Sequence, residues 1–90
     1  MKILQTPIFG KQIKKLHKNQ KNELDEAVAF ISKKPLIGEL KKGDLNGVRV
    51  YKFKMVNQLT LLAYQFDEDE FQLILLAFGS HENFYRDLKK

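Results

Sequence analysis

The spacing of apolar residues changes once along this chain of 90 residues, and that change constrains the fold more than any other feature. Up to about residue 34, apolar residues recur every three to four positions, which is the period of an amphipathic helix. From Val48 onward they alternate or run together, which is typical of half-buried and interior strands. A helical part followed by a strand part predicts an α+β fold of two layers.

The helical part has clear boundaries in the sequence. Thr6 and Pro7 suit the N-cap and the first position of a helix. The polar run 17–22 is expected to interrupt this helix, and a second one follows, with apolar residues at i, i+3, i+4 and i+7 counted from Leu24. The second helix must end before Pro35, because the residue preceding a proline disfavours the α conformation. Two short helices with a tight joint predict a helical hairpin.

The strand part is expected to form an antiparallel meander. Residues 2–5 can add a short strand ahead of the helices, and residues 36–47, with three of the five glycines, are expected to form a loop. Three strands then follow, the last two joined by the acidic residues 67–70, and Ser80 can cap a short C-terminal helix. The prediction is therefore a β-α-α-β-β-β order with a short C-terminal helix, the hairpin packed on an antiparallel sheet, in a single domain of residues 1–90.

Composition excludes several classes of protein. The chain has no cysteine, so it can form no disulfide and no thiolate nucleophile or ligand. Its longest apolar stretch is residues 73–78, whereas a helix that crosses a bilayer needs about 20 apolar residues. The N-terminus shows no apolar signal-peptide region. We expect a cytoplasmic protein with no membrane partner.

The charge is positive and unevenly distributed. The net charge is +5, with eight lysines against three acids in residues 1–34 and three basic against six acidic residues in 66–90. A basic body suits a polyanionic partner such as a nucleic acid, a ribosome or an acidic protein. The charge therefore indicates the class of partner, a polyanion, but does not identify the partner.

Two lysines of the first meander strand are candidate site residues. Lys52 and Lys54 alternate with apolar residues, so they project from the same face of the strand, about 6–7 Å apart. Ammonium groups fixed in this way can hold phosphates as point charges. The pair predicts a phosphate-binding face.

His81 is the candidate for proton transfer. It follows Gly79 and Ser80, where the last strand is expected to end. An unperturbed histidine titrates at about pH 6.5, so it can give or accept a proton at cellular pH. The other histidine, His17, lies far away in the helix joint and has no assigned role. Two distant histidines without ligand spacing predict no metal, and no other cofactor is expected.

Three further residues complete the candidate site. Arg49 follows the glycine loop and can clamp a phosphate with two hydrogen bonds, although a regular strand puts it on the face opposite Lys52. Tyr85 can stack on a base or donate its hydroxyl, and Arg86 lies next to it with a second guanidinium. These residues predict contacts with RNA or another phosphate-bearing ligand.

The chain resembles the RelE/ParE superfamily of bacterial type II toxins. Its element order fits over almost all 90 residues. The segment 50–66, VYKFKMVNQLTLLAYQF, is similar to the YKIKL…RLVYQV stretch of RelE. The segment 75–85, LLAFGSHENFY, is similar to the LLRxGSHSELF ending of the YafQ branch.

This resemblance implies roles for individual residues. Lys52 and Lys54 fall on two lysines that RelE uses in mRNA cleavage, and His81 falls on the catalytic histidine of the GSH motif. Phe84 falls on a phenylalanine implicated in the YafQ branch. One position departs from the pattern, because Leu61 stands where RelE has an arginine. That departure leaves open the ParE branch, which inhibits DNA gyrase and cuts no RNA.

The implied activity is that of a ribosome-dependent mRNA endonuclease. A 2′-hydroxyl would attack its own 3′ phosphate without a metal, with His81 as general acid, Lys52 or Lys54 as base, and the other lysine with Arg49 or Arg86 on the phosphate. The implied partners are a cognate antitoxin, the ribosome and mRNA. The alternatives are a DNA gyrase inhibitor without nuclease activity, and a degenerate toxin that survives as a binding module.

Overall fold

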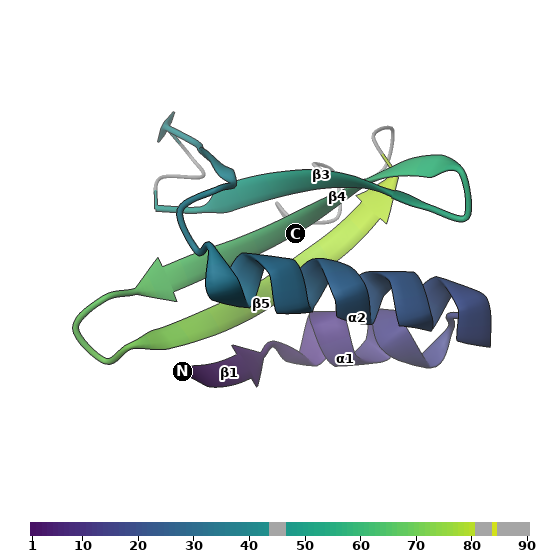
Figure 1. The fold of residues 1–90 in the computed structure, drawn as a ribbon, viewed down its shortest axis with the longest axis horizontal. Helices are drawn as coiled ribbons and strands as arrows, with labels where there is room; N and C mark the ends of the chain where they lie inside the picture. The colour runs from purple at the N-terminus through teal and green to yellow at the C-terminus, as the bar shows by residue number, and fades with distance from the viewer. Residues whose placement is uncertain (44–46, 81–83, 85–90) are drawn as a thin grey trace.

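The computed structural model describes residues 1–43, 47–80 and 84. Within them the chain forms two helices and five strands, which bury the apolar positions of the pattern. In chain order they are β1 (Lys2–Gln5), α1 (Pro7–Lys14), α2 (Lys18–Lys33), β2 (Glu39–Leu40), β3 (Arg49–Met55), β4 (Gln58–Asp67) and β5 (Gln72–Ser80). The two helices lie along one side of the sheet, and the N-terminus lies beside β1 (Figure 1). The predicted α+β class and the helical hairpin on a sheet are confirmed.

The sheet is mixed, which corrects the expectation of a wholly antiparallel one. Its strand order is β1-β5-β4-β3-β2, and the pairs β2–β3, β3–β4 and β4–β5 are antiparallel. β1 pairs parallel to β5, from Lys2 opposite Gln72 to Gln5 opposite Leu75. The sequence could not give this direction, because a parallel pair depends on the whole intervening chain returning to the same edge. The expected glycine loop also contains a strand, since Glu39 and Leu40 pair with Val50 and Arg49.

The start of α1 is tied to the sheet by Thr6. Its side chain accepts a hydrogen bond from the Phe9 N–H, as an N-cap does, and donates one to the Leu76 carbonyl on β5 at 2.6 Å. Farther along α1, the Gln12 amide both donates to the Phe78 carbonyl and accepts from the Phe78 N–H. This side chain therefore pairs with the edge of β5 beyond the end of β1.

The joint between the helices is shorter than expected. α2 begins at Lys18, so most of the polar run 17–22 forms its first turn instead of breaking the helix. His17 precedes that turn, and its N–H donates to the Gln20 side chain at 2.8 Å. α2 ends at Lys33, ahead of Pro35, as the sequence predicts.

The sheet is packed on both faces, to different extents. A larger apolar cluster fills the space between the helices and the sheet; its buried members are Phe9, Leu24, Ala27, Ile31, Leu62, Tyr64, Leu73, Leu75 and Phe78. A smaller cluster covers the other face and contains Val48, Val50, Leu61, Ala63 and Phe84. We call these two sides the helix face and the open face of the sheet. Because β4 contributes to both clusters, residues 60–64 are all buried.

Candidate functional site

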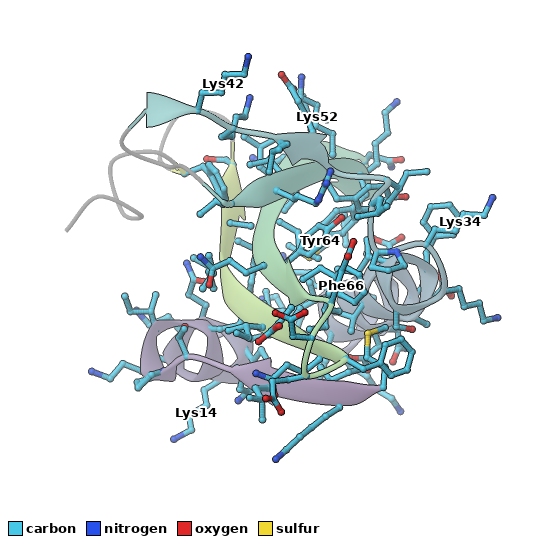
Figure 2. The ribbon with its side chains drawn as sticks, turned by 90° about the vertical axis from the view of Figure 1, so that its left-hand side faces the viewer. Lys14, Lys34, Lys42, Lys52, Tyr64 and Phe66 are labelled. Carbon is cyan, nitrogen blue, oxygen red and sulfur yellow. The ribbon has the colours of Figure 1, made fainter. Side chains whose placement is uncertain are left out.

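Strand β3 displays the predicted lysine pair on the open face. Lys52 and Lys54 are exposed, whereas Tyr51, Phe53 and Met55 between and beside them pack against the helix-face cluster. Lys52 lies opposite Leu61 on β4, and Lys54 lies opposite Leu59. Figure 2 shows Lys52 pointing into solvent on the side away from both helices. The alternation of the sequence therefore directs both lysines toward the open face, next to the smaller cluster. Lys54 also borders a hollow that Glu26 and Phe30 of α2 help to line.

The part of the open face next to Lys52 and Lys54 is apolar. Leu61 is fully buried, and Phe84, at 1% exposure, packs in the same cluster. Leu61 lies between Lys52 of β3 and Gly79 of β5 in the register of the sheet. A Cβ on Gly79 would lie 3.7 Å from the Phe84 Cα, an ordinary van der Waals distance, so Phe84 lies next to this end of β5. The position where RelE has an arginine thus forms part of a small core.

Arg49 lies on the other face and is engaged there. Its Nη1 donates to the carbonyls of Leu36, at 3.2 Å, and Gly38, at 3.0 Å. It pairs across the strands with Tyr64, whose side chain belongs to the helix-face cluster. The sheet therefore separates Arg49 from Lys52 and Lys54.

Three predicted site residues, His81, Tyr85 and Arg86, lie outside the residues that the structure describes. The expected C-terminal helix lies outside them as well, except for Phe84, which is helical. β5 ends at Ser80, opposite Thr60. Ser80, the residue before His81, therefore lies two strands away from Phe53 of β3 in the register of the sheet.

Tyr64 is a residue with a specific role that the motif analysis did not single out. Its hydroxyl donates to the Pro35 carbonyl at 2.8 Å and accepts from the Gly38 N–H at 2.9 Å. Burial raises the pKa of Tyr64, while the Gly38 hydrogen bond and the charge of Arg49 act in the opposite direction. The signal in the sequence was a tyrosine within an interior strand, because a buried hydroxyl must find partners.

Two observations concern the described part of the chain. Its histidine and acidic side chains include no group of three that could hold a metal ion. None of its helices is long and apolar enough to span a membrane.

The comparisons with known proteins identify the family. A family model, the ParE-like toxin of type II bacterial toxin–antitoxin systems, matches residues 3–89. The chain belongs to this family. It is thus a toxin of a type II system within the RelE/ParE superfamily, and the resemblance drawn from residues 50–66 and 75–85 is confirmed at that level. None of the curated proteins matches this ParE-like toxin significantly.

Solved structures of other toxins share the fold of this ParE-like toxin. A mutant of the Escherichia coli toxin RelE in the free state has a TM-score of 0.74 at 14% identity, over 98% of this chain and 88% of RelE. A chain of the intact E. coli RelBE toxin–antitoxin complex has a TM-score of 0.70 at 18% identity, over 88% of this chain and 94% of the other. A chain of the RelBE2 complex from Mycobacterium tuberculosis has a TM-score of 0.69 at 19% identity, over 89% of this chain and 96% of the other. At such identities the likeness establishes the fold alone.

Proposed function

We propose that this toxin is a ribosome-dependent mRNA endonuclease of the cytoplasm. The observation that carries the proposal is the exposed Lys52–Lys54 pair on the open face, in register across β4 with the end of β5 that precedes His81. Because both side chains project from one face of the strand, both can reach the same phosphate, where positive charge stabilises the transition state.

The proposed reaction is an internal transfer at one phosphate. The 2′-oxygen attacks phosphorus, the bond from phosphorus to the 5′-oxygen breaks, and the products are a 2′,3′-cyclic phosphate and a free 5′-hydroxyl. One of Lys52 and Lys54 acts as a neutral amine and accepts the 2′ proton, and the other, as an ammonium, holds the phosphate with Arg86. The protonated imidazole of His81 donates a proton to the departing 5′-oxygen. Tyr85 stacks on a neighbouring base. Phe84 is buried in the same cluster as Leu61 on the open face.

The ribosome is the proposed site of action. The net charge of +5 favours docking on ribosomal RNA, and such contacts weaken with salt because bound counterions are released. The ribosome would hold the mRNA so that a single scissile linkage meets the lysine pair. The domain of residues 1–90 would thus supply the chemistry and leave positioning of the substrate to its partner.

A second candidate is inhibition of DNA gyrase without nuclease activity, and one specific observation favours it. Leu61, at the position of the RelE arginine, is fully buried and apolar, so it cannot contact a phosphate. A nuclease site that lacks the arginine must stabilise its transition state with other cations. If it has none, the open face serves to bind a protein and not to cut RNA. The two candidates share the fold and differ in whether RNA is cut.

The test compares variants in a translation extract in which mRNA ends are mapped. His81→Ala is expected to lower cleavage about 10²- to 10⁴-fold, the usual contribution of one proton-transfer group. The double variant Lys52→Ala/Lys54→Ala should abolish cuts, whereas Lys14→Ala/Lys18→Ala, which removes the same charge from exposed helix positions, should retain them. Wild-type protein that leaves mRNA intact and blocks gyrase supercoiling would support the second candidate instead. Inactivity in both assays would indicate a degenerate toxin.

A further inference from the structure

An apolar surface lies where α2 ends, next to the last residues of β4, and is not part of the proposed nuclease site. Pro35, Leu36 and Ile37 follow α2, and with Lys34 and Phe66 they line a hollow of about 370 Å³. Leu36 is 56% exposed and Ile37 46%. Phe71, at 58% exposure, extends the surface, because its ring meets that of Phe66 at a centroid distance of 6.5 Å. We call Leu36, Ile37, Phe66 and Phe71 the apolar ledge.

The backbone beneath the ledge is held rigidly. The Tyr64 hydroxyl bonds to both Pro35 and Gly38, and Arg49 donates to the carbonyls of Leu36 and Gly38. A Cβ on Gly38 would lie 2.7 Å from the Tyr64 hydroxyl oxygen, so only glycine allows this approach. Figure 2 shows Tyr64 and Phe66 one above the other, beside the end of α2 marked by Lys34. Leu36 and Ile37 are thus presented to solvent by a preorganised loop, which lowers the entropic cost of binding.

The exposure of Phe71 is also imposed by the backbone. Its φ is +50°, in the left-handed region that bulky residues rarely adopt. Its N–H donates to the Glu68 carbonyl, and its carbonyl accepts from the Lys2 N–H, so the strained conformation is fixed from both sides. A strained residue that holds a large aromatic ring in water is more often found at a functional surface than elsewhere.

Opposite charges flank the ledge. Lys33 and Lys34 are exposed at the end of α2, and Glu68, Asp69 and Glu70 are exposed in the turn between β4 and β5. Among the described residues, the ion pairs are Lys21 with Asp25 and Lys41 with Glu39, so neither flank is neutralised by the other. A ligand that fits must be apolar in its middle and carry carboxylates toward the lysines and a cation toward the turn. An RNA strand does not fit, because its phosphates would face the acidic turn.

We propose that the apolar ledge binds an amphipathic segment of the cognate antitoxin. The inference rests on membership of the toxin family and on the surface itself, and it holds whether or not the chain cuts RNA. Apolar side chains of the segment fill the hollow between Ile37 and Phe66, a carboxylate faces Lys34, and a lysine or arginine faces the acidic turn. Such a polypeptide matches both the shape and the charge order of the surface.

The test measures binding of the cognate antitoxin, by calorimetry with purified proteins. The double variant Leu36→Glu/Ile37→Glu should weaken the Kd about 10- to 100-fold, as replacement of central interface residues does. The matched control is Ile8→Glu, because Ile8 is 46% exposed like Ile37 but lies on α1. The control should change the Kd less than about threefold. A ledge variant that binds like the wild type would overturn the proposal.

Two further measurements keep the outcomes distinct. If the glutamate variant does not fold, Leu36→Ala/Ile37→Ala replaces it, with a weakening of about tenfold expected. Sedimentation of the free toxin tests the rival occupant, a second copy of this chain. A wild-type dimer that the ledge variant dissociates, with an unchanged antitoxin Kd, would refute the antitoxin assignment. If the wild-type toxin cuts no mRNA, the nuclease proposal is overturned, but the comparison of antitoxin Kd values still tests the apolar ledge.

Discussion

The two faces of the sheet use neighbouring residues of the same strand for different purposes. On the helix face, Leu62 and Tyr64 pack under both helices, and the polar groups there are paired. On the open face, Leu61 and Ala63 belong to a cluster of five buried residues bordered by exposed lysines. The helix face therefore holds the chain folded, and the open face can carry unpaired charge. Because β4 is buried on both sides, a chain of 90 residues can hold a folded core on one face and display charged side chains on the other.

The largest expected effect comes from truncating the leucines of the two faces in parallel. Leu62→Ala should lower the free energy of unfolding by about 3–5 kcal/mol, because the helices prevent the large cluster from closing the cavity. Leu61→Ala should cost only about 2 kcal/mol, since a small cluster at an open surface can relax around the gap. Both leucines are fully buried, so exposure does not bias the comparison. Urea unfolding measures the difference, and equal losses would mean that the two faces contribute alike.

Tyr64→Phe gives the next largest effect and tests the polar part of the helix face. The substitution leaves the Gly38 N–H and the Pro35 carbonyl without their partner, which should cost about 1–3 kcal/mol. The control is Tyr51→Phe, because no hydrogen bond of the Tyr51 hydroxyl is found in the described part of the chain. That control should stay within about 0.5 kcal/mol of the wild type. A similar loss in both variants would remove the special role of the Tyr64 hydroxyl.

Alkaline pH should weaken the same contact more gently. Burial raises the pKa of Tyr64, and an unfolded tyrosine ionises at about pH 10. Above that pH the unfolded chain loses this proton while the folded chain keeps it, so the free energy of unfolding falls as pH rises toward the folded pKa. The stabilisation is fully present below about pH 10. Unfolding curves at about pH 8 and 11 should show a steeper loss for the wild type than for Tyr64→Phe, and parallel losses would contradict the assignment.

The elements that sequence predicted are those fixed by local rules. Thr6 and Pro7 start a helix, Pro35 lies just beyond the end of another, and the alternation around Lys52 and Lys54 sets their face. Each of these signals acts within a few residues, so no knowledge of the partner strand is needed. The family followed from two local segments for the same reason.

The features that sequence missed depend on contacts between distant residues. The parallel pairing of β1, the strand within the glycine loop and the engagement of Arg49 with Leu36 and Gly38 all join parts of the chain that no local pattern relates. Arg49 shows the difficulty best. Its residue type suits a phosphate, but the strand period puts it on the helix face, where carbonyls take up its donors. The guanidinium group suggested that Arg49 binds phosphate, but the position of Arg49 in the register of the sheet determined its actual contacts.

The smallest expected effect on stability, and the sharpest contrast with the helix face, comes from the lysine pair. Lys52→Ala/Lys54→Ala should change the free energy of unfolding by less than about 0.5 kcal/mol, because exposed side chains away from caps and cores contribute little. At low salt the double variant should be slightly more stable than the wild type, since two like charges about 7 Å apart repel by roughly 0.6 kcal/mol in water. High salt should abolish that gain by screening the charges. Urea unfolding at two salt concentrations measures both quantities. A loss above about 1 kcal/mol would mean that the lysine side chains support the small cluster, in which case a loss of mRNA cutting in this variant could no longer be assigned to chemistry.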